Sequence, residues 1–335
     1  MKKLNLKSYL INLLAITALY VLFKVLIGQG ILNRYYVGVL IFIGVNIVLA
    51  TSLNIATGFL GQLALGHAGF MAIGAYTAAL TSRALILQAT ALPNILILLI
   101  SLALAGFAAL LASLIIGIPS LRLRGDYLGI ITLGFGEVIR IVINNLNFTG
   151  KAQGLSGIAN LVNFDNIFWI TVVIVLMLYT FTNSRHGRAI VSIREDEIAA
   201  EAVGIPTIFY KIVGFSISAF FGGIGGGLYA HYISYLDPNI FSFMKSIEIL
   251  VIVVLGGMGS LTGSIIAAIV LTILPEALRE FANYRMLAYS FLLVIMMIFR
   301  PQGLFGTKEF SFSQFLHKLR YNQILSPRKK VKEVD

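Results

Sequence analysis

His67 is one of the few titratable residues within the apolar stretches of this sequence, and it lies in the segment GQLALGHAGF with Gln62 and several glycines. Contact between such polar groups and hydrocarbon is costly, so we expect His67 to face the interior of a helix bundle. There it either lines a solute pathway or makes a structural hydrogen bond to a neighbouring carbonyl group. No second histidine lies at a ligand spacing, so no metal site is expected.

Glu137 and Arg140 form a second polar feature, at the end of the segment LRLRGDYLGIITLGFGEVIR (121–140). Residues three apart share one face of a helix, so the two side chains can form an ion pair, or Arg140 can extend to the membrane surface. The alternative is a step in a proton relay. A relay needs a series of titratable groups, and the sequence shows no such series.

Motifs for enzyme chemistry are missing from the sequence. It contains no G-x-x-x-x-G-K-[ST] phosphate loop, no G-x-S-x-G nucleophile motif and no H-E-x-x-H metal motif. The chain also has no cysteine, which excludes disulfides, thiolate catalysis and Cys-ligated zinc. We therefore expect no ATP hydrolysis through a phosphate loop, no other enzyme activity and no cofactor.

The composition indicates that lipid surrounds most of the chain. Of the 335 residues, 58% are hydrophobic and 12% are charged, and the mean hydropathy is +0.92. Apolar runs long enough to cross a bilayer as helices recur along the chain. They predict an all-α integral membrane protein with spans near residues 9–27, 35–56, 61–82, 93–118, 127–145, 167–184, 212–234, 247–260, 263–281 and 284–299. The first run follows a basic start but lacks a cleavage site, so we interpret it as a retained helix.

Membrane topology explains the net charge of +11. Basic residues accumulate in cytoplasmic segments, and about ten spans with both termini cytoplasmic satisfy that rule. The outer segments then hold Arg34, Arg83, Lys151, Lys245, Arg279 and Arg285. No basic groove with interleaved aromatic residues indicates nucleic-acid binding. The prediction is a transmembrane domain over residues 1–310 and a basic cytoplasmic tail over residues 311–335, in a bacterial-type cytoplasmic membrane.

Glycines interrupt two of the predicted spans. Ten spans divide into halves of five, and an odd number in each half gives the halves opposite orientations, which is an inverted repeat. The third span carries Gly58, Gly61, Gly66, Gly69 and Gly74, and the eighth ends at Gly256, Gly257, Gly259 and Gly263. Glycine lets a helix unwind beside a pathway or lets helices pack closely, and both interpretations stay open. The candidate pathway residues are Gln62, Gly66, His67, Gly69, Gly256, Gly257 and Gly259.

The polar stretch of residues 185–211 is predicted to lie in the cytoplasm. Within it, REDEIAAEAV indicates a short helix, because its acidic start complements the helix dipole and Gly204 and Pro206 end it. The helix is rich in alanine and has little apolar area to pack against its own chain. It is either a docking surface for a partner or a solvated loop helix. The candidate coupling residues are Glu197, Ala199, Ala200, Glu201, Ala202 and Gly204.

Three stretches carry a resemblance to a known family. They are GFLGQLALGHAGFMAIGAYTAA at 58–79, the segment 121–140, and REDEIAAEAVGIPTIFYKIVGFSISAFFGGIGGGLYA at 194–230, and the similarity extends to the ending FRPQGLFG. They resemble the LivM-type permease subunits of the branched-chain amino acid ABC importers. The third stretch is also similar to the coupling motif of ABC importers, Glu-Ala-Ala, three residues and Gly, with Ala199, Ala200 and Gly204 in register. Ile198 stands where that motif has Glu.

The resemblance implies a permease subunit that carries leucine, isoleucine or valine across the cytoplasmic membrane. It implies a second, LivH-type permease, two cytoplasmic ATPase subunits and an extracytoplasmic amino-acid-binding protein as partners. Closure of the ATPases would pull on the 194–204 helix and rock the permeases between two states. Similar chains occur in urea and amide importers, which stay an alternative, as do a secondary transporter and a membrane scaffold. The central spans show no obvious charge, which suits a zwitterion with an apolar side chain.

Overall fold

A computed structural model describes residues 6–88, 92–120 and 127–278, together with residues 290, 291, 294, 298, 303, 304 and 306. The predicted tenth span lies almost wholly outside these residues, and the predicted basic tail lies wholly outside them. The chain divides into two compact units, one of residues 38–307 and one of residues 1–37 with 308–335. In the smaller unit, the helix α1 (Leu6–Gly28) exposes large apolar side chains such as Leu13 and Leu14, as lipid contact requires.

The described part of the chain contains six helices that are long and apolar enough to cross a membrane. They are α2 (Arg34–Asn54) with its π-helical end Ile55–Phe59, α3 (His67–Gln88), α4 (Asn94–Ser120), α5 (Tyr127–Asn145), α6 (Phe164–Thr182) and α9 (Thr207–Ile233). The helices α10 (Phe243–Gly256) and α11 (Leu261–Ala277) are shorter. The chain is therefore a multi-pass, mostly helical membrane protein.

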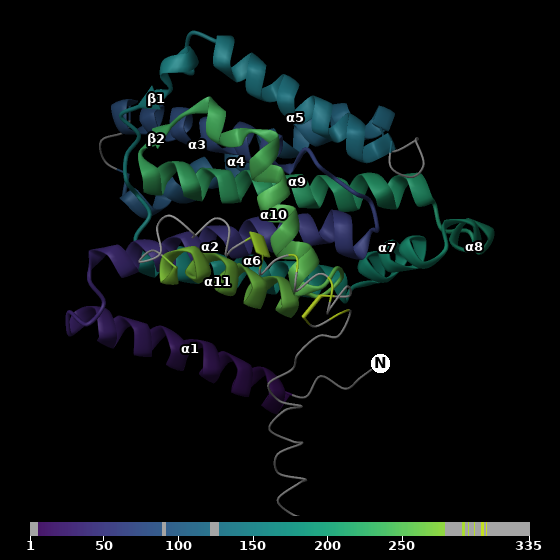
Figure 1. Cartoon of the computed structure of the whole chain (residues 1–335), viewed down its shortest axis with the longest axis horizontal. Coiled ribbons are helices and arrows are strands. Elements are labelled where there is room, and N and C mark those ends of the chain that lie inside the picture. Colours follow the sequence, from purple (N-terminus) through teal and green to yellow (C-terminus); the bar gives the residue numbers. More distant parts are fainter. Residues whose placement is uncertain are drawn as a thin grey trace, which may run out of the picture. The chain divides into compact units, whose positions relative to one another are not determined.

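The helices α3, α4 and α9 pack against one another and form the core of the larger unit (Figure 1). The glycine run Gly222–Gly227 of α9 makes this close packing possible. A Cβ atom on Gly223 would lie 2.6 Å from the Cβ atom of Ala109 in α4, and one on Gly74 of α3 would collide with the backbone of Gly223. Small residues at such crossings let helix backbones approach closely in a membrane.

The helix α4 shows why one face of each outer helix can contact lipid. Phe107, Leu111 and Ile115 recur at helical spacing and are each more than half exposed. Ala105 and Ala109, on another face, are fully buried and lie against α9. The small residues thus face the core of the unit, and the large apolar residues face outward.

The helix α3 begins later than the apolar run predicts. The run predicts a span from residue 61, whereas α3 starts at His67 and residues 60–64 have no helical structure. Gly61 has a φ of +73°, which ends the preceding π-helical turn. Side chains from other helices satisfy part of the freed backbone, since Thr132 Oγ1 accepts from the Leu65 amide at 3.1 Å and Ser246 Oγ from the Ala68 amide at 2.9 Å.

The predicted span 247–260 is also displaced. Helix α10 begins at Phe243 and ends at Gly256, because Gly257 and Gly259 have φ values of +112° and +87° that an α-helix does not contain. Helix α11 then starts after Ser260, whose hydroxyl group accepts from the Gly263 amide. A glycine break therefore separates two short helices.

At the opposite end of α10, two short strands connect loops that are far apart in the sequence. Strand β1 (Leu155–Ser156) pairs antiparallel with β2 (Tyr235–Leu236), with Leu155 opposite Leu236. A 3-10 turn (Pro238–Phe241) leads from β2 into α10. We call this part of the unit the Asn239 end.

The polar stretch between α6 and α9 contains two helices where the sequence predicts one. Helix α7 (Arg185–Glu195) precedes α8 (Glu197–Ala202), and the extended residue Asp196 separates them. The Asp196 carboxylate accepts hydrogen bonds from the amides of Ile198 and Ala199 at 2.9 and 3.0 Å, so it caps α8. The acidic residues therefore divide between the end of one helix and the start of the next.

Candidate substrate pathway and coupling segment

Asn54, at the end of α2, joins that helix to the break between α10 and α11. Its Nδ2 atom donates to the Ser260 carbonyl and to Ser264 Oγ, both at 2.8 Å, and its Oδ1 atom accepts from the Gly259 amide at 2.9 Å. The side chain is fully buried. Because every polar atom of the amide group is engaged, this contact holds the two helix ends together inside the protein.

Arg194, in the last turn of α7, reaches the same place. Its Nη1 atom donates to the Gly58 carbonyl at 2.8 Å, and its guanidinium group also pairs with Glu195. A Cβ atom on Gly259 would lie 2.6 Å from Nη1 of Arg194, and one on Gly61 would lie 2.7 Å from its Cγ. We call Asn54, Gly58, Arg194, Gly259 and Ser260 the Arg194 junction, and their part of the unit the Arg194 end.

A second ion pair ties α8 to α9. The Lys211 Nζ atom donates to both carboxylate oxygens of Glu197 at 2.7 Å, and the Lys211 side chain is only 3% exposed. On the inner side of α8, Ala200 is buried. Ile198 and the following residue Val203 are 72% and 77% exposed. Helix α8 is thus held at its base, and its exposed side carries large apolar side chains.

The candidate coupling residues lie on both sides of α8. Ala199, Glu201, Ala202 and Gly204 are exposed, Ala200 is buried, and Glu197 contacts Lys211. Gly204 has a φ of +87°, and its amide donates to the Glu201 carbonyl at 3.0 Å. Gly204 thus adopts the left-handed conformation that commonly follows the end of a helix.

The first turn of α3 places His67 against two other helices. The ring is almost fully buried, its Nε2 atom lies 3.1 Å from Ser52 Oγ of α2, and a Cβ atom on Gly222 of α9 would lie 2.7 Å from its Cε1 atom. The expected interior position is confirmed. The hydrogen-bond partner of its Nε2 atom is a serine hydroxyl group.

The candidate pathway glycines lie in close backbone contacts. A Cβ atom on Gly66 would collide with the Thr132 carbonyl, one on Gly69 would lie 2.9 Å from the Gly136 Cα atom, and one on Gly256 would lie 2.6 Å from the Gly263 carbonyl. Gln62 is half-buried in the non-helical stretch before α3. These close contacts account for glycine at these positions by helix packing. That the same residues line a pathway stays a prediction.

A pocket of about 270 Å³ lies between α2, α3, α9, α10 and α11. None of the candidate pathway residues is among the described residues that line it. The apolar runs indicate no charged lining, whereas Lys245, Glu248 and Glu276 all line this pocket. Sequence patterns miss them because Lys245 precedes the predicted span and Glu276 lies near the end of another.

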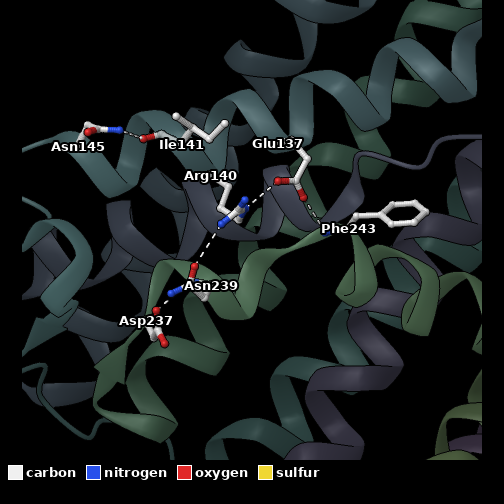
Figure 2. Close-up of polar contacts among 7 residues, drawn as sticks. All are labelled: Glu137, Arg140, Ile141, Asn145, Asp237, Asn239 and Phe243. Carbon is white, nitrogen blue, oxygen red and sulfur yellow. Dashed lines mark hydrogen bonds and ion pairs between the residues drawn. The ribbon is translucent and has the colours of Figure 1, made fainter.

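Glu137 and Arg140 form the ion pair that their spacing predicts, at 2.7 Å (Figure 2). The second carboxylate oxygen of Glu137 accepts from the Phe243 amide at 2.8 Å, and Arg140 Nη1 donates to Asn239 Oδ1 at 3.1 Å. The pair therefore anchors the start of α10 to α5 at the Asn239 end. This long-range role has no signal in the local sequence.

No group of His, Asp and Glu side chains among the described residues is placed to hold a metal ion. Three residues that make long-range polar contacts were not selected by motif analysis: Asn54, Arg194 and Lys211. A polar residue within or beside an apolar run is the signal that could have indicated them.

Comparison with known proteins gives matches along most of the chain. The sequence profile of the family described as "Branched-chain amino acid transport system / permease component" matches residues 35–300. The high-affinity branched-chain amino acid transport system permease protein LivM of Escherichia coli is 38% identical over 296 residues, which cover 78% of this chain and 67% of that protein. No solved structure matches the chain closely enough to count as a relative.

Two further relatives are more distant. A probable branched-chain amino acid transport permease protein LivM of Methanocaldococcus jannaschii is 23% identical over 320 residues, which cover 81% of this chain and 93% of that protein. The permease protein LivH of Escherichia coli is 28% identical over 165 residues, which cover 48% of this chain and 52% of that protein. The resemblance seen in the sequence is confirmed, and the chain belongs to the family of permease components of branched-chain amino acid transport systems.

Proposed function

We propose that this chain is a permease subunit of an ABC importer that carries branched-chain amino acids across the cytoplasmic membrane, with energy from separate ATPase subunits. Membership of the permease family supports the class. The observation that supports the mechanism is the Arg194 junction, since one side chain connects the exposed segment α7–α8 to the glycine breaks at Gly58 and Gly259. A movement of that segment would reach the membrane-embedded helix ends directly.

We further propose ten spans in an inverted repeat of five and five. An irregular segment precedes α3, the third predicted span, and another precedes α10, the eighth. In an inverted repeat these two segments occupy equivalent places on opposite sides of the membrane. The glycine break after α10 meets the end of α2 at the Arg194 end, so the two glycine-rich breaks contact each other.

The Arg194 end faces the cytoplasm in this proposal. Arg185, Arg188 and Arg194 lie in the loop between α6 and α9, and basic residues are retained on the cytoplasmic side. The same distribution of basic residues between the predicted spans assigns both chain termini to the cytoplasmic side. The Asn239 end then faces the exterior, where a binding protein would deliver the solute.

The docking surface for the ATPase would be the exposed side of α8 with Gly204. The coupling motif has Glu at the position of Ile198, and the neighbouring Glu197 is already paired with Lys211. Glu201 is the remaining exposed carboxylate of α8, and Ile198 and Val203 supply apolar area. The attachment would therefore depend on apolar contact more than on an ion pair.

Co-purification of the ATPase with single variants tests this docking surface. Ala202→Arg places bulk and charge on the exposed side of α8, so it should strongly reduce the amount of ATPase recovered with the permease complex and should abolish uptake. Lys151→Ala, in a loop at the Asn239 end, is the control and should leave attachment unchanged. Full attachment in Ala202→Arg would mean that α8 is a solvated loop helix.

The other subunits follow from the relatives. LivH relatives align with about half of this chain, as expected if a second permease of related fold completes the membrane part. A binding protein would select the solute on the outer side. Identifying the solute that this binding protein holds separates leucine, isoleucine and valine from urea or amides, and bound urea would overturn the proposed substrate class.

A further inference from the structure

The pocket between α2, α3, α9, α10 and α11 has a size that suits a small solute. Its volume of about 270 Å³ lies just below the roughly 300–1,000 Å³ of sites for drug-sized ligands. Helices of both proposed repeat halves contribute to it, since α2 and α3 come from one half and α9, α10 and α11 from the other. Solute sites of transporters lie at such repeat interfaces.

The charged residues of the pocket gather toward the Asn239 end. Lys245 and Glu248 lie in the first turns of α10, which starts beside Glu137 at that end. Glu276 lies in the last turn of α11, the end of that helix away from the Arg194 junction. Lys245 Nζ lies 2.9 Å from Glu248 Oε2, and the Glu248 side chain is 50% exposed. An ammonium group and carboxylate groups therefore line the same pocket.

The other end of the pocket is apolar. Leu49, Met71, Ile252 and Leu271 line it and are buried. Ile252 lies seven residues beyond Lys245 on α10, or about 10 Å along a helix at 1.5 Å per residue. The hydrogen bond from Asn46 Nδ2 to Thr272 Oγ1 at 2.9 Å lies between the charged and the apolar part. Leu49 is five residues from Asn54, so the apolar part is next to the Arg194 junction.

This division of charge selects among solutes. A dicarboxylate would meet the carboxylates of Glu248 and Glu276, and urea would leave the apolar part without a partner. A zwitterionic amino acid can exchange its carboxylate for Glu248 on Lys245 and direct its ammonium group to the acidic side chains. A branched aliphatic side chain would then bury its apolar surface on Leu49, Ile252 and Leu271.

We propose that this pocket is the site in the permease that receives the amino acid from the binding protein, with Lys245, Glu248 and Glu276 binding its charged groups and Leu49, Ile252 and Leu271 its aliphatic side chain. The assignment rests on the proposed function. The Arg194 junction lies beyond the apolar part, so its opening would release the solute to the other side.

Uptake by the complete reconstituted transporter tests the site with a matched pair on α11. Thr272→Phe places a ring in the pocket and should lower leucine uptake at least about tenfold. Ile273→Phe, whose native side chain is 44% exposed and is not among the lining residues, should keep near-normal uptake. Lys245→Gln should lower uptake as strongly as Thr272→Phe, and Lys151→Gln should not. ATPase attachment should be normal in all four variants.

A binding measurement that does not depend on activity completes the test. Because the chain has no cysteine, Thr272→Cys gives one reactive position in this subunit. In the complex, a large excess of leucine should slow its modification by a polar thiol reagent at least about fivefold, whereas urea and glutamate should not. Normal leucine uptake in Thr272→Phe and Lys245→Gln, or no protection by leucine, would overturn the site. A wild-type complex that does not take up leucine would instead overturn the proposed function.

Discussion

At the scale of single residues, Arg194 makes the contact on which the proposed coupling depends. Its guanidinium group satisfies the Gly58 carbonyl, which the end of the π-helical turn leaves without a helical partner. The side chain is partly buried, and the Gly259 and Gly61 backbones lie directly against it. A planar, permanently charged group with several donors suits this position better than lysine.

We expect Arg194→Gln to lower ATP-driven uptake at least about tenfold while the ATPase stays attached. A hydrogen bond to a charged group contributes about 1.5–3 kcal/mol, and tenfold corresponds to about 1.4 kcal/mol. Arg188 is the matched control, because it lies on the same helix and donates to the Asn183 carbonyl at 2.9 Å, away from the junction. Equal uptake in the Arg188→Gln and Arg194→Gln complexes would contradict the role of Arg194.

Gly204 is the second residue whose conformation can be tested. Its positive φ opposes a β-branched side chain by about 1–2 kcal/mol, although nothing lies within 4 Å of an added Cβ atom. Gly204→Val should therefore weaken ATPase attachment through the backbone and not through crowding. Gly204→Asn should attach nearly normally, because asparagine adopts the left-handed region more easily. Co-purification measures both, and equal loss in the two variants would indicate crowding by the partner instead.

At the scale of elements, α9 holds the membrane core together through its glycine run. The run brings α9 against α3 and α4 closely enough that backbone atoms replace side chains at the crossings. Asn54 and the ion pair between Lys211 and Glu197 then fix the neighbouring elements at the Arg194 end. Close packing makes such a core resist gradual deformation, so helices move as whole units.

We predict that Gly223→Ala lowers the free energy of unfolding by about 1–3 kcal/mol, because its Cβ atom meets Ala109 and the Ala105 carbonyl at 2.6 and 2.7 Å. Gly134→Ala on α5 is the control. Nothing lies within 4 Å of an added Cβ atom there, and alanine favours a helix by up to about 1 kcal/mol over glycine. Thermal unfolding in detergent compares the two. A Gly223→Ala protein as stable as the wild type would mean that the crossing is loosely packed.

At the scale of the whole molecule, the proposed function makes this subunit one part of a larger transporter. The sequence contains no phosphate loop, and Ile198 and Val203 of the segment α7–α8 are exposed. The purified chain in liposomes should therefore show neither ATP hydrolysis nor leucine uptake. Adding the second permease, the ATPases and the binding protein should restore both. Uptake by the chain alone under an ion gradient would indicate a secondary transporter.

Several features of this protein follow from local sequence. Apolar runs predict the helix over residues 127–145 with the same bounds that α5 has, and the spacing of Glu137 and Arg140 predicts their ion pair. The end of the short helix before Gly204 follows from a glycine and a proline close together. These features depend on helix geometry over a few residues or on membrane thickness, so they require no knowledge of the fold.

Other features depend on contacts between residues that are distant in the sequence. Asn54 and Ser260 are joined although 206 positions separate them, and Arg194 reaches Gly58 across 136 positions. A glycine in the sequence looks the same whether it lines a pathway or packs against a neighbouring helix. Only the arrangement of the folded helices shows which contacts each glycine makes. The pocket likewise combines side chains from α2, α3, α9, α10 and α11. Its charge distribution exists only once those helices are folded together, because no local pattern encodes which polar residues will share one cavity.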